Sequence, residues 1–289
     1  MAATRLVLVC LIAISGLDAQ APDPLPDQEH FFAEVRRRLA SNDHIQSRYS
    51  YRERSTELHL NLFGRMGTGA VQVFDVYPHP NEKLTYRRLI ERDGRPSSAD
   101  ELAAQDRDYR KRLADWQRRV AREGTTERLA RLRDAEQARR KDEARTREAL
   151  DVFTFAVEGR ATWDGEPAIV IRFAPRPDVS PRSREGRVAH AFTGRVWVHE
   201  HEYQVMSVEA TAIDDVSFGW GLVARLYKGS TARFTRRRID GAWLPAATRF
   251  EGTGRAMLVR TVVIDFSRDY LDYRAFEPAD LPARLGWDR

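Results

Sequence analysis

Cysteine is almost absent from this 289-residue chain: its one cysteine, Cys10, lies in the only long apolar run. If that run is removed as a leader, the mature protein has no disulfide and no thiol chemistry. Lysine is also scarce, with four among 48 basic residues, and the net charge of +5 is spread along the chain. Nucleic-acid binding needs a concentrated basic patch, so we exclude it. The lack of a second long apolar run excludes a polytopic membrane protein.

The N-terminus has the pattern of a leader. Met1–Arg5 carries positive charge, Leu6–Leu17 is apolar, and small residues follow. The run is too short to span a bilayer, so we predict a secretory signal peptide over 1–19 and a Pro-rich linker over 20–26. The residue before Cys10 is valine, whereas a lipoprotein signal needs a small residue there. We expect a periplasmic or secreted protein that is not a lipoprotein and has no transmembrane segment after cleavage. The alternative is an uncleaved N-terminal anchor.

Most of the remaining chain predicts one helix and many strands. After Asp27, Phe31, Phe32, Val35 and Leu39 recur at helical spacing. From Tyr49 apolar residues alternate with polar ones, so we assign the helix and the first strands to 27–97 and the remaining strands to 151–276. Three Asp-Gly pairs predict tight hairpin turns. We therefore predict an antiparallel meander that nearly closes into a barrel, followed by a loose tail over 277–289.

The segment 98–150 interrupts the strands. Ser98 and Glu101 have the spacing of a capping box, and about half of the next fifty residues are charged. Apolar residues form a single stripe on the first half, and Gly124 separates it from a second helical half. We predict an antiparallel helical hairpin inserted into the sheet. The stripe is a candidate partner-binding surface formed by Tyr109, Leu113, Trp116 and Val120.

The chain offers little catalytic chemistry. His199 and His201 are two apart and could share a strand face with His190 upstream, which is the basis of a metal-dependent hydrolase as one alternative. A polar turn is the simpler interpretation, because His199–Glu202 lies between two predicted strands. The zinc-protease motif H-E-x-x-H is also absent, since the residue four after His199 is Tyr203. The glycines from Gly64 to Gly69 precede a strand, so they do not form a phosphate loop. We expect that the protein is not an enzyme and that it has no catalytic residue, metal or cofactor.

Five strand motifs carry a resemblance, and they are Tyr49–Tyr51, Trp163–Ile171, Gly194–Val198, Ile239–Pro245 and Asp272–Phe276. They resemble secreted bacterial proteins related to the LolA/LolB lipoprotein-sorting carriers, in particular members with a charged helical insertion. That resemblance implies an α+β fold: an open antiparallel β half-barrel, covered by helices, whose concave apolar face holds acyl chains in the carriers.

Two functions remain open besides the hydrolase. The first is a non-enzymatic binder of a lipid, a lipoprotein acyl chain or another hydrophobic ligand. The second is an envelope scaffold that captures a protein partner through the helical hairpin, because its charges are balanced along the helices. For the first, bulky residues alternate with glycines over 218–222, where the bare strand face admits a ligand or a packed helix. The candidate ligand-binding residues are Phe218, Trp220, Leu222, Val196 and Val198.

Overall fold

The computed structural model describes residues 24–41, 45–59, 67–181, 183–218, 224–256 and 260–287. The expected signal peptide over 1–19 lies outside the described residues. The described helices are α1 (Gln28–Ser41), α2 (Ala99–Arg122), α3 (Thr125–Asp151), α4 (Arg184–Ala189) and α5 (Leu281–Leu285), with 3-10 turns η1 (Gln46–Arg48), η2 (Glu82–Leu84) and η3 (Pro278–Asp280). None of these helices combines the length and apolar character needed to cross a membrane.

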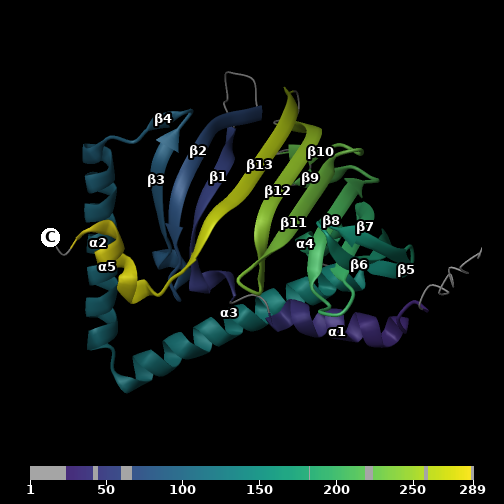
Figure 1. The fold of residues 1–289 in the computed structure, drawn as a ribbon, viewed down its shortest axis with the longest axis horizontal. Coiled ribbons are helices and arrows are strands. Elements are labelled where there is room, and N and C mark those ends of the chain that lie inside the picture. The colour runs from purple at the N-terminus through teal and green to yellow at the C-terminus, as the bar shows by residue number, and fades with distance from the viewer. Residues whose placement is uncertain are drawn as a thin grey trace, which may run out of the picture.

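The strands form one antiparallel sheet, strongly curved and open (Figure 1). Its order is β4-β3-β2-β1-β13-β12-β11-β8-β7-β6-β5, and the hairpin of β9 and β10 pairs with the far end of β12. This confirms the expected open half-barrel with helices. The strands are β1 (Tyr49–His59), β2 (Gly67–Tyr77), β3 (Tyr86–Arg92), β4 (Arg95–Pro96), β5 (Phe153–Trp163), β6 (Glu166–Pro175), β7 (Phe192–His199), β8 (Val205–Ala212), β9 (Val216–Phe218), β10 (Ala224–Leu226), β11 (Thr231–Ile239), β12 (Ala242–Ala256) and β13 (Arg260–Ala275).

Three Asp-Gly turns set the register of the meander. In Asp93-Gly94, Asp164-Gly165 and Asp240-Gly241 both residues have positive φ, between 49° and 81°. Aspartate and glycine tolerate this left-handed conformation, and the resulting turn matches the twist of paired strands. The three hairpins predicted from these pairs are confirmed.

Helix α1 covers one face of the sheet, which we call the inner face. Phe31 is fully buried and Val35 nearly so, and both belong to a core cluster with Ile169, Ile171 and Val198. Phe31 and Val35 are four residues apart on α1, and Ile169 and Ile171 are two apart on β6. Each of the two elements therefore presents one apolar side to the other. Burial of a side chain as large as Phe31 contributes about 2–3 kcal/mol, which holds α1 on the sheet.

Helix α2 packs on the opposite, outer face beside β3. Ser98 and Glu101 form the predicted capping box, with both reciprocal hydrogen bonds present, at 3.2 and 2.7 Å. Tyr109 is 2% exposed, and its ring stacks on Tyr86 with 4.3 Å between centroids. Asp106 accepts from the Tyr86 hydroxyl at 2.6 Å. The apolar stripe of α2 is therefore core.

The two long helices do not form the antiparallel hairpin that the sequence predicted. They diverge from the corner at Gly124, and α3 runs below the sheet toward β5 (Figure 1). The physical reason is that α2 uses its stripe on β3, whereas Leu129 and Leu132 of α3 stay 47% and 50% exposed. Because β4 and β5 lie at opposite edges of the sheet, α2 and α3 together carry the chain from one edge to the other.

The C-terminal segment is ordered as far as it is described, so the expected loose tail over 277–289 is wrong. Leu281 is 3% exposed and belongs to the cluster of Tyr86 and Tyr109. The Trp287 ring lies 6.1 Å from that of Tyr109, and Arg284 donates to the Ala275 carbonyl at 2.6 Å. The tail packs because its apolar residues cover the end of the α2 stripe.

Candidate functional site

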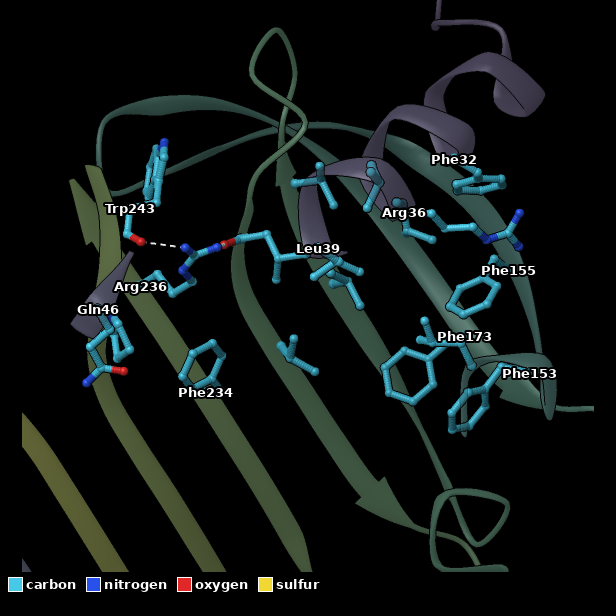
Figure 2. A pocket seen from close by; sticks show the side chains of 18 residues that line it. Phe32, Arg36, Leu39, Gln46, Phe153, Phe155, Phe173, Phe234, Arg236 and Trp243 are labelled. Atoms are coloured by element: carbon cyan, nitrogen blue, oxygen red, sulfur yellow. Dashed lines mark hydrogen bonds between the residues drawn. The ribbon is translucent and has the colours of Figure 1, made fainter. Parts of the chain in front are cut away.

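A cavity of about 570 Å³ lies between α1 and the inner face (Figure 2). Its wall comes from α1, the end of α3, β5, β6, β7, β8, β11 and β12, with η1 at one end. All but three of the 18 lining residues are apolar, and the exceptions are Arg36, Gln46 and Arg236. Its volume is in the range of small-molecule sites, which are usually apolar with a few polar groups.

The strand register builds this wall. Ile171 of β6 lies opposite Val196 of β7, which lies opposite Val208 of β8, which lies opposite Phe234 of β11. Directly paired residues point to the same face of a sheet, so four successive strands contribute one apolar side chain each to the cavity.

Phenylalanines gather at one end of the cavity. The rings of Phe153 and Phe173 lie 4.9 Å apart, and those of Phe32 and Phe155 6.1 Å apart. Phe173 fits because its partner on β7 is Gly194, where an added Cβ would lie 2.8 Å from the ring and 1.9 Å from the Glu209 carbonyl oxygen. Glycine is thus required for the close approach of β7 and β8 under this ring.

Arg236 lies at the other end and is 9% exposed (Figure 2). Its Nη1 donates to the Gln204 side-chain oxygen at 3.2 Å and to the Val205 carbonyl at 3.3 Å, and its Nη2 donates to the Trp243 carbonyl. Burial lowers the pKa of Arg236, and the nearby Tyr273 opposes that shift. A guanidinium stays protonated in proteins, so the site contains a buried positive charge.

The remainder of the inner face has a different character. Beyond the cavity, Phe234 of β11 pairs with Thr248 of β12, which pairs with Arg268 of β13, which pairs with Ser55 of β1. The inner face therefore continues across β13 and β1 to β2 and β3. Here Glu53 is 4% exposed and pairs with Arg87 at 2.7 Å and Arg268 at 3.2 Å. We call β5 to β8 and β11 the apolar half, and β1 to β3 with β13 the polar half.

A tyrosine cluster completes the polar half. Tyr51 lies 5.7 Å from Tyr270 and 5.3 Å from Tyr273, measured between ring centroids. The Tyr273 hydroxyl donates to the Pro245 carbonyl at 2.9 Å. Burial, followed by the charge of Glu53, raises the pKa of Tyr51, and burial raises that of Tyr273. Both hydroxyls therefore stay neutral at ordinary pH and contribute packing and hydrogen bonding rather than charge.

The structure places two of the sequence-predicted ligand residues in the cavity wall. Val196 and Val198 both line it. Phe218 is the last described residue of β9 and its side chain is not described, while Trp220 and Leu222 lie outside the described residues. The role proposed for these three remains a prediction.

Sequence reasoning missed Arg236 and the phenylalanine end. The signal for Arg236 lies in the strand Thr231–Ile239, where three arginines follow one another after Phe234. Period two puts Arg236 and Arg238 on the face of Phe234 and Arg237 on the opposite face, so the sequence predicts two inward arginines. Of these two the structure buries Arg236, whereas Arg238 lies near the end of the strand, is exposed and pairs with Glu202. The phenylalanine end could have been found from the sequence, because Phe153 and Phe155 are two apart on one strand and the next strand of the hairpin contains Phe173.

The proposed partner-binding stripe is largely occupied by the chain itself. Tyr109 is buried, and Leu113 packs against the same cluster. The Trp116 ring lies edge-on to His79 at 5.2 Å, and Val120 is half-buried. The stripe is thus an internal contact of α2, and the expectation that these residues form an open partner surface is corrected.

The three histidines of the hydrolase alternative do not converge. His190 Nε2 lies 2.9 Å from the Arg176 carbonyl. His199 is buried, its Nδ1 accepts from two backbone N–H groups at 3.2 Å, and its Nε2 is 3.5 Å from Glu166. Burial lowers the pKa of His199. Among the described residues no group of three metal-ligating side chains comes together.

Comparison with known proteins adds two likenesses of fold. No protein-family description and no curated protein matches the chain. A DUF1329 family protein from Desulfovibrio piger is 12% identical over 91% of this chain and 99% of its own, with a TM-score of 0.28. An outer membrane lipoprotein-sorting protein domain from Vibrio parahaemolyticus is 11% identical over 90% and 99%, with a TM-score of 0.29.

Proposed function

We propose that this protein is a non-enzymatic binder or carrier of a hydrophobic ligand with an acyl chain, acting in the bacterial periplasm or outside the cell. The observation that carries the proposal is the cavity of about 570 Å³, whose wall is apolar except for three residues. The predicted signal peptide supports the location. The scarcity of converging titratable groups in the cavity supports binding rather than catalysis.

Burial of the chain supplies the affinity. Each CH₂ removed from water contributes about 0.8 kcal/mol, so two more methylenes lower Kd roughly tenfold. The apolar half presents branched and aromatic side chains along successive strands, which suit a flexible alkyl chain. Directional hydrogen bonds are not needed along the chain, so the wall discriminates by length and volume.

The first experiment is native mass spectrometry of the protein expressed with its leader and purified from the periplasm under mild conditions. We expect an added mass that extracts into organic solvent. The delipidated protein is then titrated with an alkyl ladder from eight to eighteen carbons. We expect Kd to fall roughly tenfold for every two carbons until the cavity is filled. An apo mass together with no binding at any length would refute the proposal.

A cavity-filling variant tests where the chain binds. Val196→Phe adds volume inside the cavity, and we expect the optimal chain to become shorter and the affinity for sixteen carbons to fall about tenfold or more. The matched control is Arg195→Phe, which introduces the same side chain on the same strand, at an exposed position whose ion pair with Glu158 is worth little. Equal effects of the two variants would place the ligand elsewhere.

A further inference from the structure

The buried arginine of the cavity has no anionic partner within the described chain. Arg236 is 9% exposed, and the three acceptors of its hydrogen bonds are an amide oxygen and two backbone carbonyls, all neutral. The residues lining the cavity include no aspartate and no glutamate. A buried charge without a counter-charge is costly, so its presence in an apolar wall requires a reason.

The buried carboxylates that the structure describes are both paired. Glu53 contacts two arginines, and Asp106 contacts Arg88 at 2.9 Å. Acids near Arg236 in the sequence or the sheet are also engaged, since Glu202 accepts from Arg238 and from the Trp243 indole at 2.7 Å. Arg236 is therefore an exception among the buried charged side chains that the structure describes.

Counting donors shows which side of the guanidinium remains available. It has five N–H groups, of which Nη1 uses two and Nη2 uses one on neutral acceptors. The Nε–H donates to no acceptor among the described residues, and Nη2 carries two N–H groups but donates to one acceptor, so a carboxylate can accept from Nε and share Nη2 with the Trp243 carbonyl. Nε and Nη2 share one edge of the guanidinium plane, and such an edge binds the two oxygens of a carboxylate in bidentate fashion.

The cavity has the polarity of an amphiphile. Arg236 and Gln46 lie at one end, and Phe153, Phe155 and Phe173 lie at the other (Figure 2). The third polar lining residue, Arg36 of α1, is exposed, and Figure 2 shows it beside Phe32 and Phe155. One buried cation and one long apolar wall correspond to one anionic group on one alkyl chain.

We propose that the ligand is a single-chain carboxylate amphiphile of the fatty-acid class, with its carboxylate on the Nε–Nη2 edge of Arg236 and its chain directed toward the phenylalanine end. This inference rests on the proposed function, since it assigns the head group of the ligand that the cavity binds. It makes Arg236 the residue that selects the head group, while the strands select the chain.

The test compares head groups at constant chain length. Delipidated full-length mature protein is titrated calorimetrically with palmitate, with hexadecanol, which is neutral, and with hexadecyl phosphate, all below their aggregation limits. We expect palmitate to bind about 10- to 100-fold tighter than hexadecanol, the range of a charge-assisted hydrogen-bonded pair. We expect Arg236→Met to reduce the ratio of palmitate affinity to hexadecanol affinity to about one, and Arg236→Lys to retain part of the preference.

Matched variants keep the test interpretable. Arg233→Met is the control, because Arg233 is exposed on the same strand and pairs with Glu209 at 2.7 Å; we expect it to leave all three affinities unchanged. Retained hexadecanol binding shows that Arg236→Met is folded with an intact cavity. If Arg236→Met unfolds, the head-group assignment is tested instead by the ratio of palmitate affinity to hexadecanol affinity in the wild type and in Arg236→Lys.

Each remaining outcome has a defined meaning. Equal binding of palmitate and hexadecanol overturns the head-group assignment and leaves the proposed function standing. Tighter binding of hexadecyl phosphate than of palmitate overturns the carboxylate and indicates a phosphate head group. If Arg36→Met loses the preference for palmitate over hexadecanol and Arg236→Met keeps it, the carboxylate binds at Arg36 of α1 and the inference is overturned. If none of the three ligands binds, the proposed function itself fails.

Discussion

The two halves of the inner face share one continuous antiparallel register but differ in how their buried charged side chains are paired. In the polar half, Glu53 contacts two arginines, and Arg87 in turn lies 4.2 Å above the Phe74 ring. In the apolar half, the strands and α1 leave a cavity of about 570 Å³ and one buried arginine without an acid among the described residues. In the polar half the buried acid has two arginines as counter-charges, whereas in the apolar half a buried arginine lies beside free volume without an acid among the described residues.

This difference suggests a division of labour. Packing and ion pairs of the polar half stabilise the curvature of the sheet, so that the apolar half can stay partly empty. Free volume in a core is destabilising because the lining atoms lose contacts. A fold that keeps such a cavity must gain stability elsewhere, and the network around Glu53 is a buried, connected source of it.

The largest expected effect comes from breaking that network. Glu53→Gln removes the charge that holds Arg87 and Arg268, and we expect the free energy of unfolding to fall by about 3 kcal/mol. Urea denaturation measures it, with an unchanged m-value as the sign that the native state is intact. Alkyl-chain affinity of the folded protein should not change. Glu251→Gln, at an exposed position of β12, is the control, and an equal loss there would contradict the contrast between the halves.

A smaller and pH-dependent effect is expected on the outer side of the polar half. Burial alone would raise the pKa of Asp106, but hydrogen bonds from Tyr86 and Arg88 outweigh it, so the folded pKa is lowered. The carboxylate therefore stabilises the fold at pH values above its unfolded pKa of about 3.9, and this contribution is lost as the pH falls through the folded pKa.

Asp106→Asn measures this contribution directly. We expect the variant to be about 2 kcal/mol less stable than the wild type at pH 7, and the difference to shrink between pH 4 and pH 2. Urea denaturation of both proteins across that range is the measurement. A difference that stays constant down to pH 2 would show that the side chain acts through packing rather than through its charge.

Much of the fold was predictable because local signals agreed with the tertiary structure. The Asp-Gly turns need left-handed backbone, Ser98 and Glu101 cap a helix by themselves, and strand alternation marks the inner face wherever one side is buried. Val196 and Val198 followed from the same alternation. These features depend on residues close together in the sequence, and neighbouring chemistry is enough to determine them.

The errors concern contacts between distant segments. The direction of α3 depends on β4 and β5 lying at opposite sheet edges, which no local pattern of 98–150 contains. The order of the tail depends on Trp287 and Leu281 meeting Tyr86 and Tyr109. Arg236 was missed because a run of arginines is typical of a solvated strand, and only the register with Val208 and Phe234 shows that one points inward.

The smallest expected effect concerns α3, which joins the far edges of the two halves. At 27 residues it extends about 40 Å, and its exposed faces carry ion pairs such as Arg139 with Glu136 and Glu143. A helix that is polar on most sides is stabilised by such pairs rather than by a core. We expect Leu129→Gln with Leu132→Gln to change stability by at most about 0.5 kcal/mol and chain affinity not at all. A loss of several kcal/mol in urea denaturation would mean that α3 packs against the sheet and couples the two halves, and they would then have to be treated as one unit.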